Sequence, residues 1–96
     1  MFEWDEAKNQ ANIGKHGLSF STASRIFQGP VLSVIDDRRD YGEVRQVSIG
    51  RIDGVLIIVV VHTDRAGLTR IISARPAKRR ERDRYEEALR NRAVTH

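Results

Sequence analysis

The sequence predicts a small α+β protein, with a pair of helices at the N-terminus, a mostly antiparallel sheet of about four strands, and a basic helix at the C-terminus. Three observations support this prediction. Apolar residues recur at helical spacing near both ends of the chain, β-branched runs fill residues 31–74, and positive charge is concentrated after residue 69. A chain of 96 residues is expected to form a single domain over residues 1–96.

Residues 2–4 can form a short opening strand, and the rest of the first 30 residues are expected to hold the two short helices. Asp5 is suited to cap the first helix, because its carboxylate can accept the unpaired N–H groups of the first turn. Gly17 suits the left-handed position that follows the last turn. Either Ser19 or Ser21 can cap the second helix, which should end before Pro30.

The central sheet is predicted from strand-like runs that are separated by turn signals. These runs are residues 31–35, 43–52, 55–62 and 68–74. Asp53-Gly54 favours a two-residue hairpin, since both residue types tolerate a positive φ. The run from Val55 to His62 lacks alternation, which indicates a central strand that is buried on both faces.

The last quarter of the chain carries all of the excess positive charge. Residues 70–96 hold nine Lys and Arg against four Asp and Glu, whereas residues 1–69 hold eight against nine. Pro76 should end the last strand, and residues 77–91 should form a helix with Tyr85 and Leu89 on a narrow apolar stripe. Clustered cations indicate a phosphate-bearing or acidic partner, and the alternative is a solvated helix with no partner.

The composition excludes several classes of protein. Hydrophobic residues make up 40% of the chain and charged residues 31%, which is typical of a globular domain. The sequence has no cysteine, so disulfides, thiolate zinc sites and a catalytic cysteine are ruled out, and a cytoplasmic location is expected. The opening residues are not typical of a signal peptide, and the apolar run 55–61 is too short to span a membrane.

Motifs for many common chemistries are missing from the sequence. It contains no HExxH, no Walker loop, no GxGxxG and no GxSxG, and its three histidines are not spaced as metal ligands. We therefore expect neither a metal nor a cofactor, which leaves acid–base chemistry assisted by cations, or no chemistry. RNA cleavage fits this inventory, because the RNA 2′-hydroxyl is an internal nucleophile and arginines can hold the phosphate bidentately.

Several segments, in their order and spacing, resemble the family of BrnT-type toxins. They are residues 2–8 (FEWDEAK), 12–20 (NIGKHGLSF), 43–45 (EVR), 49–51 (IGR) and 70–77 (RIISARPA), together with Ala23, Phe27, Glu81 and Tyr85. The resemblance covers residues 2–89. It implies a RelE-like fold, ribonuclease activity, inhibition of translation, and a cognate BrnA-like antitoxin with a ribbon-helix-helix part. Operator DNA would be bound only through this antitoxin.

Two arginines are the first candidates for catalysis. Arg51 lies at a strand end before the hairpin, where it could contact the phosphate or the transition state. The alternative for Arg51 is a solvent-facing residue, paired for instance with Asp53. Arg75 lies between the last strand and the basic helix, where it could clamp a phosphate. The alternative for Arg75 is a structural salt bridge, for instance to Glu81.

The second pair of catalytic candidates is Lys15 and His16 at the end of the first helix. His16 could serve as general acid or base, with electrostatic support from Lys15. The alternative is that both cations only oppose the helix dipole. His62 is more typical of a hydrogen-bonded core residue. Glu43 and Glu81 are expected to orient arginines rather than to act as bases.

The last helix supplies the candidates for binding RNA or the antitoxin. They are Lys78, Arg79, Arg80, Arg82 and Tyr85. For Tyr85, packing on the apolar stripe is the favoured role, and stacking on a base is the alternative.

Taken together, the sequence favours a metal-independent endoribonuclease toxin that leaves a 2′,3′-cyclic phosphate and a 5′-hydroxyl. One alternative is a non-enzymatic basic module, or an inactive toxin homologue, that docks an antitoxin or nucleic acid. A DNA-binding regulator is the weaker alternative, because no helix-turn-helix signal stands out.

Overall fold

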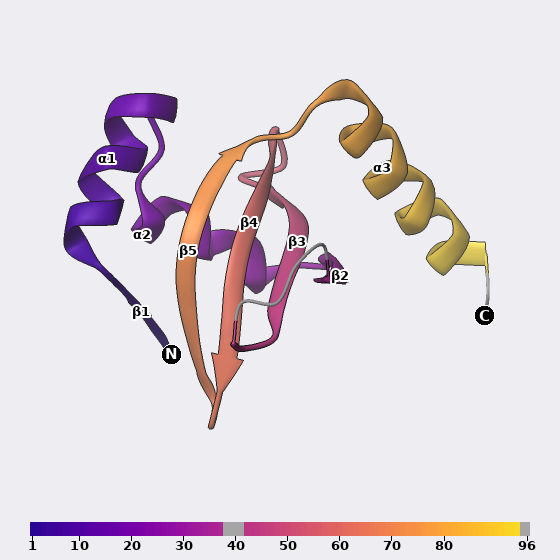
Figure 1. Cartoon of the computed structure of the whole chain (residues 1–96). Coiled ribbons are helices and arrows are strands. Elements are labelled where there is room, and N and C mark those ends of the chain that lie inside the picture. The colour runs from indigo at the N-terminus through magenta and orange to yellow at the C-terminus, as the bar shows by residue number, and fades with distance from the viewer. Residues whose placement is uncertain (38–41, 95–96) are drawn as a thin grey trace.

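A five-stranded mixed sheet with helices on both sides forms the framework of the protein (Figure 1). The computed structural model describes residues 1–37 and 42–94. The elements, in chain order, are β1 (Phe2–Trp4), α1 (Glu6–His16), α2 (Phe20–Ala23), the 3₁₀ helix η1 (Ser24–Gln28), β2 (Leu32–Asp36), β3 (Arg45–Ile52), β4 (Leu56–Arg65), β5 (Leu68–Pro76) and α3 (Arg79–Val94). The strand order is β1-β5-β4-β3-β2.

The α+β class is confirmed, and the four predicted strands are β2 to β5, joined by antiparallel pairing. The sheet differs from the prediction in one respect. β1 adds a fifth strand, parallel to β5, with Phe2 opposite Thr69 and Trp4 opposite Ile71. The partner of a three-residue strand is chosen by backbone pairing at an open sheet edge, which leaves little trace in the side-chain pattern.

The helix caps follow from the local sequence. Asp5 accepts a hydrogen bond from the Ala7 N–H at 2.8 Å, and Gly17 ends α1 at a φ of 67°. Ser19, rather than Ser21, caps α2 by accepting from the Thr22 N–H at 3.1 Å. The second helix is tighter than expected, since its α-helical part has four residues and then continues as η1.

The hairpin and the central strand are both confirmed. Asp53 and Gly54 adopt φ values of 54° and 72°, as the predicted turn requires, but Ile52 pairs with Leu56, so Val55 also belongs to the connection. β4 lies between β3 and β5, and residues 57–60 are buried. This strand therefore separates two hydrophobic cores, one on each face of the sheet.

The larger core lies between the sheet and the N-terminal helices, and its buried members are Leu18, Phe20, Ala23, Ile26, Ile52, Ile58, Val60, Ile71 and Ala74. The smaller core lies under α3, and its buried members are Ile49, Ile57, Val59, Ala77 and Tyr85. Figure 1 shows α1 beyond β5 and α3 on the other side of the sheet. Among the described residues, no helix is both long and apolar enough to cross a membrane.

Helix α1 is polar, and asparagines rather than apolar side chains attach it. Asn12 accepts from the Ala74 N–H at 3.2 Å and donates to the Leu18 carbonyl at 2.8 Å. Asn9 accepts from the Phe20 N–H at 2.8 Å. Both asparagines are buried, so these hydrogen bonds fix the end of β5 and the start of α2 against α1.

Candidate functional site

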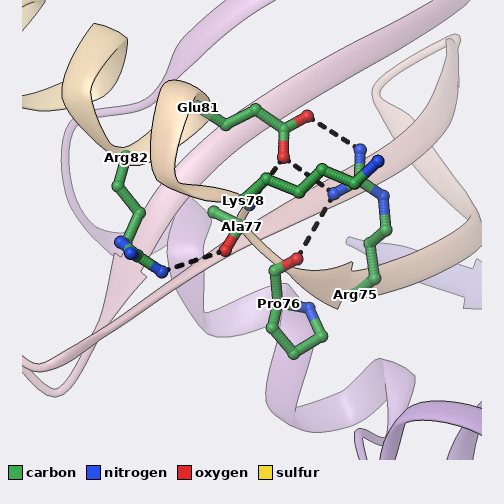
Figure 2. A network of polar contacts seen from close by, with 6 residues as sticks. All are labelled: Arg75, Pro76, Ala77, Lys78, Glu81 and Arg82. Carbon is green, nitrogen blue, oxygen red and sulfur yellow. Dashed lines mark hydrogen bonds and ion pairs between the residues drawn. The ribbon is translucent and has the colours of Figure 1, made fainter.

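The corner between β5 and α3 is held by a bidentate ion pair. Arg75 is the penultimate residue of β5, and Glu81 lies in the first turn of α3. Figure 2 shows the two parallel contacts, which join Nη1 to Oε1 and Nη2 to Oε2, each at 2.8 Å. The ion pair is the structural salt bridge expected as the alternative role of Arg75, and its geometry fixes the plane of the guanidinium as well as its position.

Glu81 has a second role at the start of the helix. Its Oε1 atom accepts from the Lys78 N–H at 2.8 Å, as a glutamate at the third helical position does when it reaches back to the N-cap residue. The hydrogen bonds from Arg75 lower the pKa of Glu81 to about 2, with the Lys78 N–H acting in the same direction and burial opposing it. Glu81 is therefore ionised wherever the protein is near neutral pH.

Arg51 approaches the same helix from β3. Its Nη2 atom lies 3.6 Å from Oε1 of Glu86, and its guanidinium carbon lies 5.8 Å from the centre of the Tyr85 ring. The alternative prediction, in which Arg51 pairs with Asp53, is wrong, because Asp53 is paired with Arg25. The reason is tertiary: η1 packs against β3 and brings Arg25 to the hairpin.

Tyr85 anchors α3 to the body of the protein. It is 2% exposed, and its hydroxyl donates to the Pro30 carbonyl at 2.7 Å. This placement matches the packing role and leaves little ring surface for a nucleobase. Arg51 and Arg75 both meet α3 around this anchor, and because β4 separates their strands, their Cα atoms lie at least about 10 Å apart.

Lys15 and His16 occupy the last turn of α1. In Figure 1 this turn lies toward the same end of the sheet as the end of β5, but on the other side of β5 from α3. The structure thus brings the two arginines to one helix, and the Lys15–His16 pair to the neighbouring edge.

The basic residues at the start of α3 surround an open depression of about 620 Å³, lined by Lys78, Arg79, Arg80, Glu81 and Arg84. Arg82 points elsewhere, since its Nη1 atom donates to the Ala77 carbonyl at 3.3 Å (Figure 2). Three of the predicted binding residues therefore share a surface next to the Arg75–Glu81 pair. Arg82 is instead tied to the corner backbone.

His62 is a core residue, as expected. It is 2% exposed, and its ring and that of Phe27 pack in a T-shaped arrangement with 5.1 Å between ring centres. Its Nε2 atom lies 2.7 Å from the Ser48 hydroxyl, and its Nδ1 atom lies 3.0 Å from a carboxylate oxygen of Asp64. Glu43 contacts Arg65 at 3.0 Å, in line with its expected arginine-orienting role.

A groove next to the corner between β5 and α3 was not predicted from the sequence. It has a volume of about 470 Å³ and crosses the α3-bearing face of the sheet, with a floor of Val47, Val59, Val61 and Ser73. Arg75 and Glu81 line one end, and Asp37 lines the other side. We call this feature the sheet groove. Val47 on β3 and the alternate valines Val59 and Val61 on β4 could have indicated it, but only the pairing of the strands brings them together.

These features define a class: a small basic α+β protein that presents arginines and a cationic depression suited to phosphate groups. The family described as "Ribonuclease toxin, BrnT, of type II toxin-antitoxin system" matches residues 4–81. The chain belongs to this BrnT family of ribonuclease toxins, and membership of a type II system implies an antitoxin partner.

A solved structure supports the same assignment. The chain is similar to the crystal structure of the Brucella abortus ribonuclease toxin, BrnT, with 30% sequence identity and a TM-score of 0.61. The similarity covers 82% of this chain and 99% of the Brucella chain. Among curated proteins, none matches this chain.

Proposed function

We propose that this protein is a metal-independent endoribonuclease that inhibits translation by cutting RNA in the cytoplasm. The observation that carries the proposal is the bidentate Arg75–Glu81 pair beside the basic depression, in a chain of a ribonuclease toxin family. An arginine that a carboxylate has already oriented loses less conformational freedom when it binds a phosphate. Among the described residues, no three His, Cys, Asp or Glu side chains gather as metal ligands, which favours cations as the source of positive charge.

The reaction is a transesterification within the RNA. The 2′-oxygen attacks the adjacent phosphorus and the bond to the 5′-oxygen breaks, which yields a 2′,3′-cyclic phosphate and a 5′-hydroxyl. One proton leaves the 2′-hydroxyl and one reaches the departing 5′-oxygen, so the step needs a base and an acid. Negative charge grows on the phosphate oxygens in the transition state, where fixed cations stabilise it most.

The candidate residues divide these tasks. Arg75 and Arg51 stabilise the phosphate, and the basic residues Lys78, Arg79 and Arg80 hold the flanking RNA backbone. His16, with Lys15 beside it, is the candidate for proton transfer, acting from the edge of the sheet at which α1 ends. The RNA would then cross the end of β5, between α1 and the start of α3.

The direct test is cleavage of single-stranded RNA in EDTA. The 3′ ends of the products are then identified by whether they can be ligated only after an enzyme has opened a 2′,3′-cyclic phosphate. We expect cleavage in EDTA, and a loss of about 10²–10³-fold in rate for Arg75→Ala. Arg75→Lys should recover little, since lysine cannot bind bidentately. Arg90→Ala is the matched control, because Arg90 is an exposed arginine of the same helix outside the depression.

Two results would count against the proposal. Loss of cleavage in EDTA that Mg²⁺ restores would remove the metal-independent mechanism. Growth inhibition that survives the double substitution Arg51→Ala and Arg75→Ala, but not removal of the charges at Lys78, Arg79 and Arg80, would identify a binding module instead of an enzyme.

We further propose that the antitoxin is BrnA-like, with a ribbon-helix-helix part through which the complex binds operator DNA. An acidic segment of such a partner would be attracted to the basic depression and would compete there with RNA. Co-expression with the neighbouring reading frame tests this idea. A stable complex that no longer cleaves RNA is expected, and a partner that binds without affecting cleavage would contradict the shared surface.

A further inference from the structure

Apart from Arg75 and Glu81 at one end, the proposed chemistry does not use the sheet groove. Helix α3 covers one half of its sheet face, over Ile49 and Ile57. The next row of the sheet, formed by Val34, Val47, Val61 and Ser73 in register on four strands, is only partly buried and lines the groove. At about 470 Å³, the groove falls within the range of about 300–1,000 Å³ that is typical of small-ligand sites.

The chemistry of the groove is different at its two sides. Its floor is aliphatic, and one end is formed by the oriented guanidinium of Arg75. The opposite side holds two carboxylates, of which Asp36 is buried and engaged within the protein, while Asp37 is exposed. A ligand that matches this pattern has an anionic group at one end, a flat apolar body, and hydrogen-bond donors at the far edge.

A nucleotide of single-stranded RNA has these three features in this order. Its phosphate would meet Arg75, its base would lie on the valines, and the Watson–Crick edge of the base would face Asp37. We propose that the sheet groove is a base-binding subsite for the nucleotide next to the scissile phosphate, and that it prefers guanine. This inference rests on the proposed function, because it takes the phosphate at Arg75 to belong to the RNA that is cut.

The preference for guanine follows from the chemistry of a carboxylate. An ionised carboxylate only accepts hydrogen bonds, and its two oxygens can accept from two adjacent donors. Guanine presents N1–H and an N2 amino group side by side on this edge. Adenine and cytosine present an amino group next to an acceptor, and uracil presents one N–H between two carbonyls. Only guanine therefore satisfies both oxygens of Asp37 without placing an acceptor against them.

The first test uses the intact protein and the four nucleoside 5′-monophosphates, with ribose 5-phosphate as the ligand without a base. Methyl NMR spectra should show saturable changes at Val47 and Val61, and none at Val55, which is 84% exposed at the hairpin. We expect GMP to bind at least about tenfold more tightly than UMP, since one good bidentate contact separates them. Ribose 5-phosphate should leave the valine signals unchanged.

Paired substitutions provide the second test. Val47→Phe fills the groove and should weaken GMP binding at least about tenfold, whereas the same change at the exposed Val55 should not. Asp37→Asn should remove the preference for GMP over AMP, whereas Asp83→Asn, on exposed α3, should not. Thermal unfolding of each variant shows whether it is folded, and the wild-type NMR titration does not depend on any variant.

The outcomes separate this inference from the function on which it rests. If the valine signals respond to no mononucleotide, or if folded Val47→Phe protein cuts RNA at the wild-type rate and with the same base preference, the subsite is refuted and the ribonuclease stands. If GMP binds in the groove but RNA is not cut, the ribonuclease is refuted, and with it the scissile phosphate at Arg75, while the groove itself remains a guanine-binding site. If the antitoxin but no nucleotide perturbs the valines, the groove is a protein-docking surface and the subsite is refuted.

Discussion

Replacing Glu81 with Gln tests how much the β5–α3 corner contributes to stability. Gln keeps the size of the side chain and an oxygen that can accept from the Lys78 N–H, but it removes the charge that faces Arg75. A pKa lowered from 4.5 to about 2 corresponds to about 3 kcal/mol in favour of the ionised folded state, at about 1.4 kcal/mol per pKa unit. The side chains of Arg75 and Glu81 are 35% and 24% exposed, so solvent screening reduces this value to about 1–2 kcal/mol.

The direction of the pH dependence follows from the lowered pKa. Because the folded pKa of Glu81 is below the unfolded one, its stabilisation is complete above about pH 5 and is lost as the pH falls toward about 2. At pH 7, Glu81→Gln should therefore lower the free energy of unfolding by about 1–2 kcal/mol, which for a domain of this size lowers Tm by about 4–8 °C per kcal/mol. By pH 3, the difference from wild type should have shrunk by about half or more.

Urea denaturation at pH 7, 5, 4 and 3 measures this difference, with Glu87→Gln as the matched control. Glu87 is an exposed glutamate of the same helix, so its substitution removes the same charge without touching the corner. Equal stability of the two variants at pH 7 would refute a stabilising role of the Arg75–Glu81 pair. A difference between Glu81→Gln and wild type that stays constant from pH 7 to pH 3 would show that the ionisation of Glu81 is not its source.

Two further predictions concern packing and the attachment of α3. Gly50→Ala should destabilise the protein by about 1–3 kcal/mol in urea denaturation, because its new Cβ would lie 2.6 Å from the Ile26 Cβ. Gly14→Ala should instead stabilise the protein by up to about 1 kcal/mol, because Gly14 lies in α1 with open space around it. Equal effects of the two changes would contradict the close approach of η1 to β3. Tyr85→Phe should lower the free energy of unfolding by about 1 kcal/mol, because the hydrogen bond to the Pro30 carbonyl is lost. Hydrogen exchange should then show faster opening of α3 than in wild type. Unchanged exchange would mean that this hydrogen bond does not hold the helix.

Much of the candidate site could be identified from the sequence as a set of residues, but not as a geometry. The positions of Arg51 and Arg75 at strand ends follow from local patterns, and the pairing of Arg75 with Glu81 joins residues only six apart. The partners of Arg51 could not be predicted, because Glu86 and Tyr85 reach it only through the packing of α3 on β3. Contacts between residues close in the sequence can be predicted from their spacing, whereas contacts between distant elements depend on how those elements pack.

The α+β class, the four antiparallel strands, the Asp5 and Gly17 caps and the turn at Asp53-Gly54 could be predicted from the sequence, because each depends on neighbouring residues and on periodicity. Only the folded chain shows that β1 pairs with β5, that Asp53 pairs with Arg25, and that the Tyr85 hydroxyl donates to the Pro30 carbonyl. It also shows that valines from β3 and β4 line one groove next to Arg75. The physical reason is that sheet register and helix packing bring together side chains far apart in the chain, and no local pattern encodes which of them will meet.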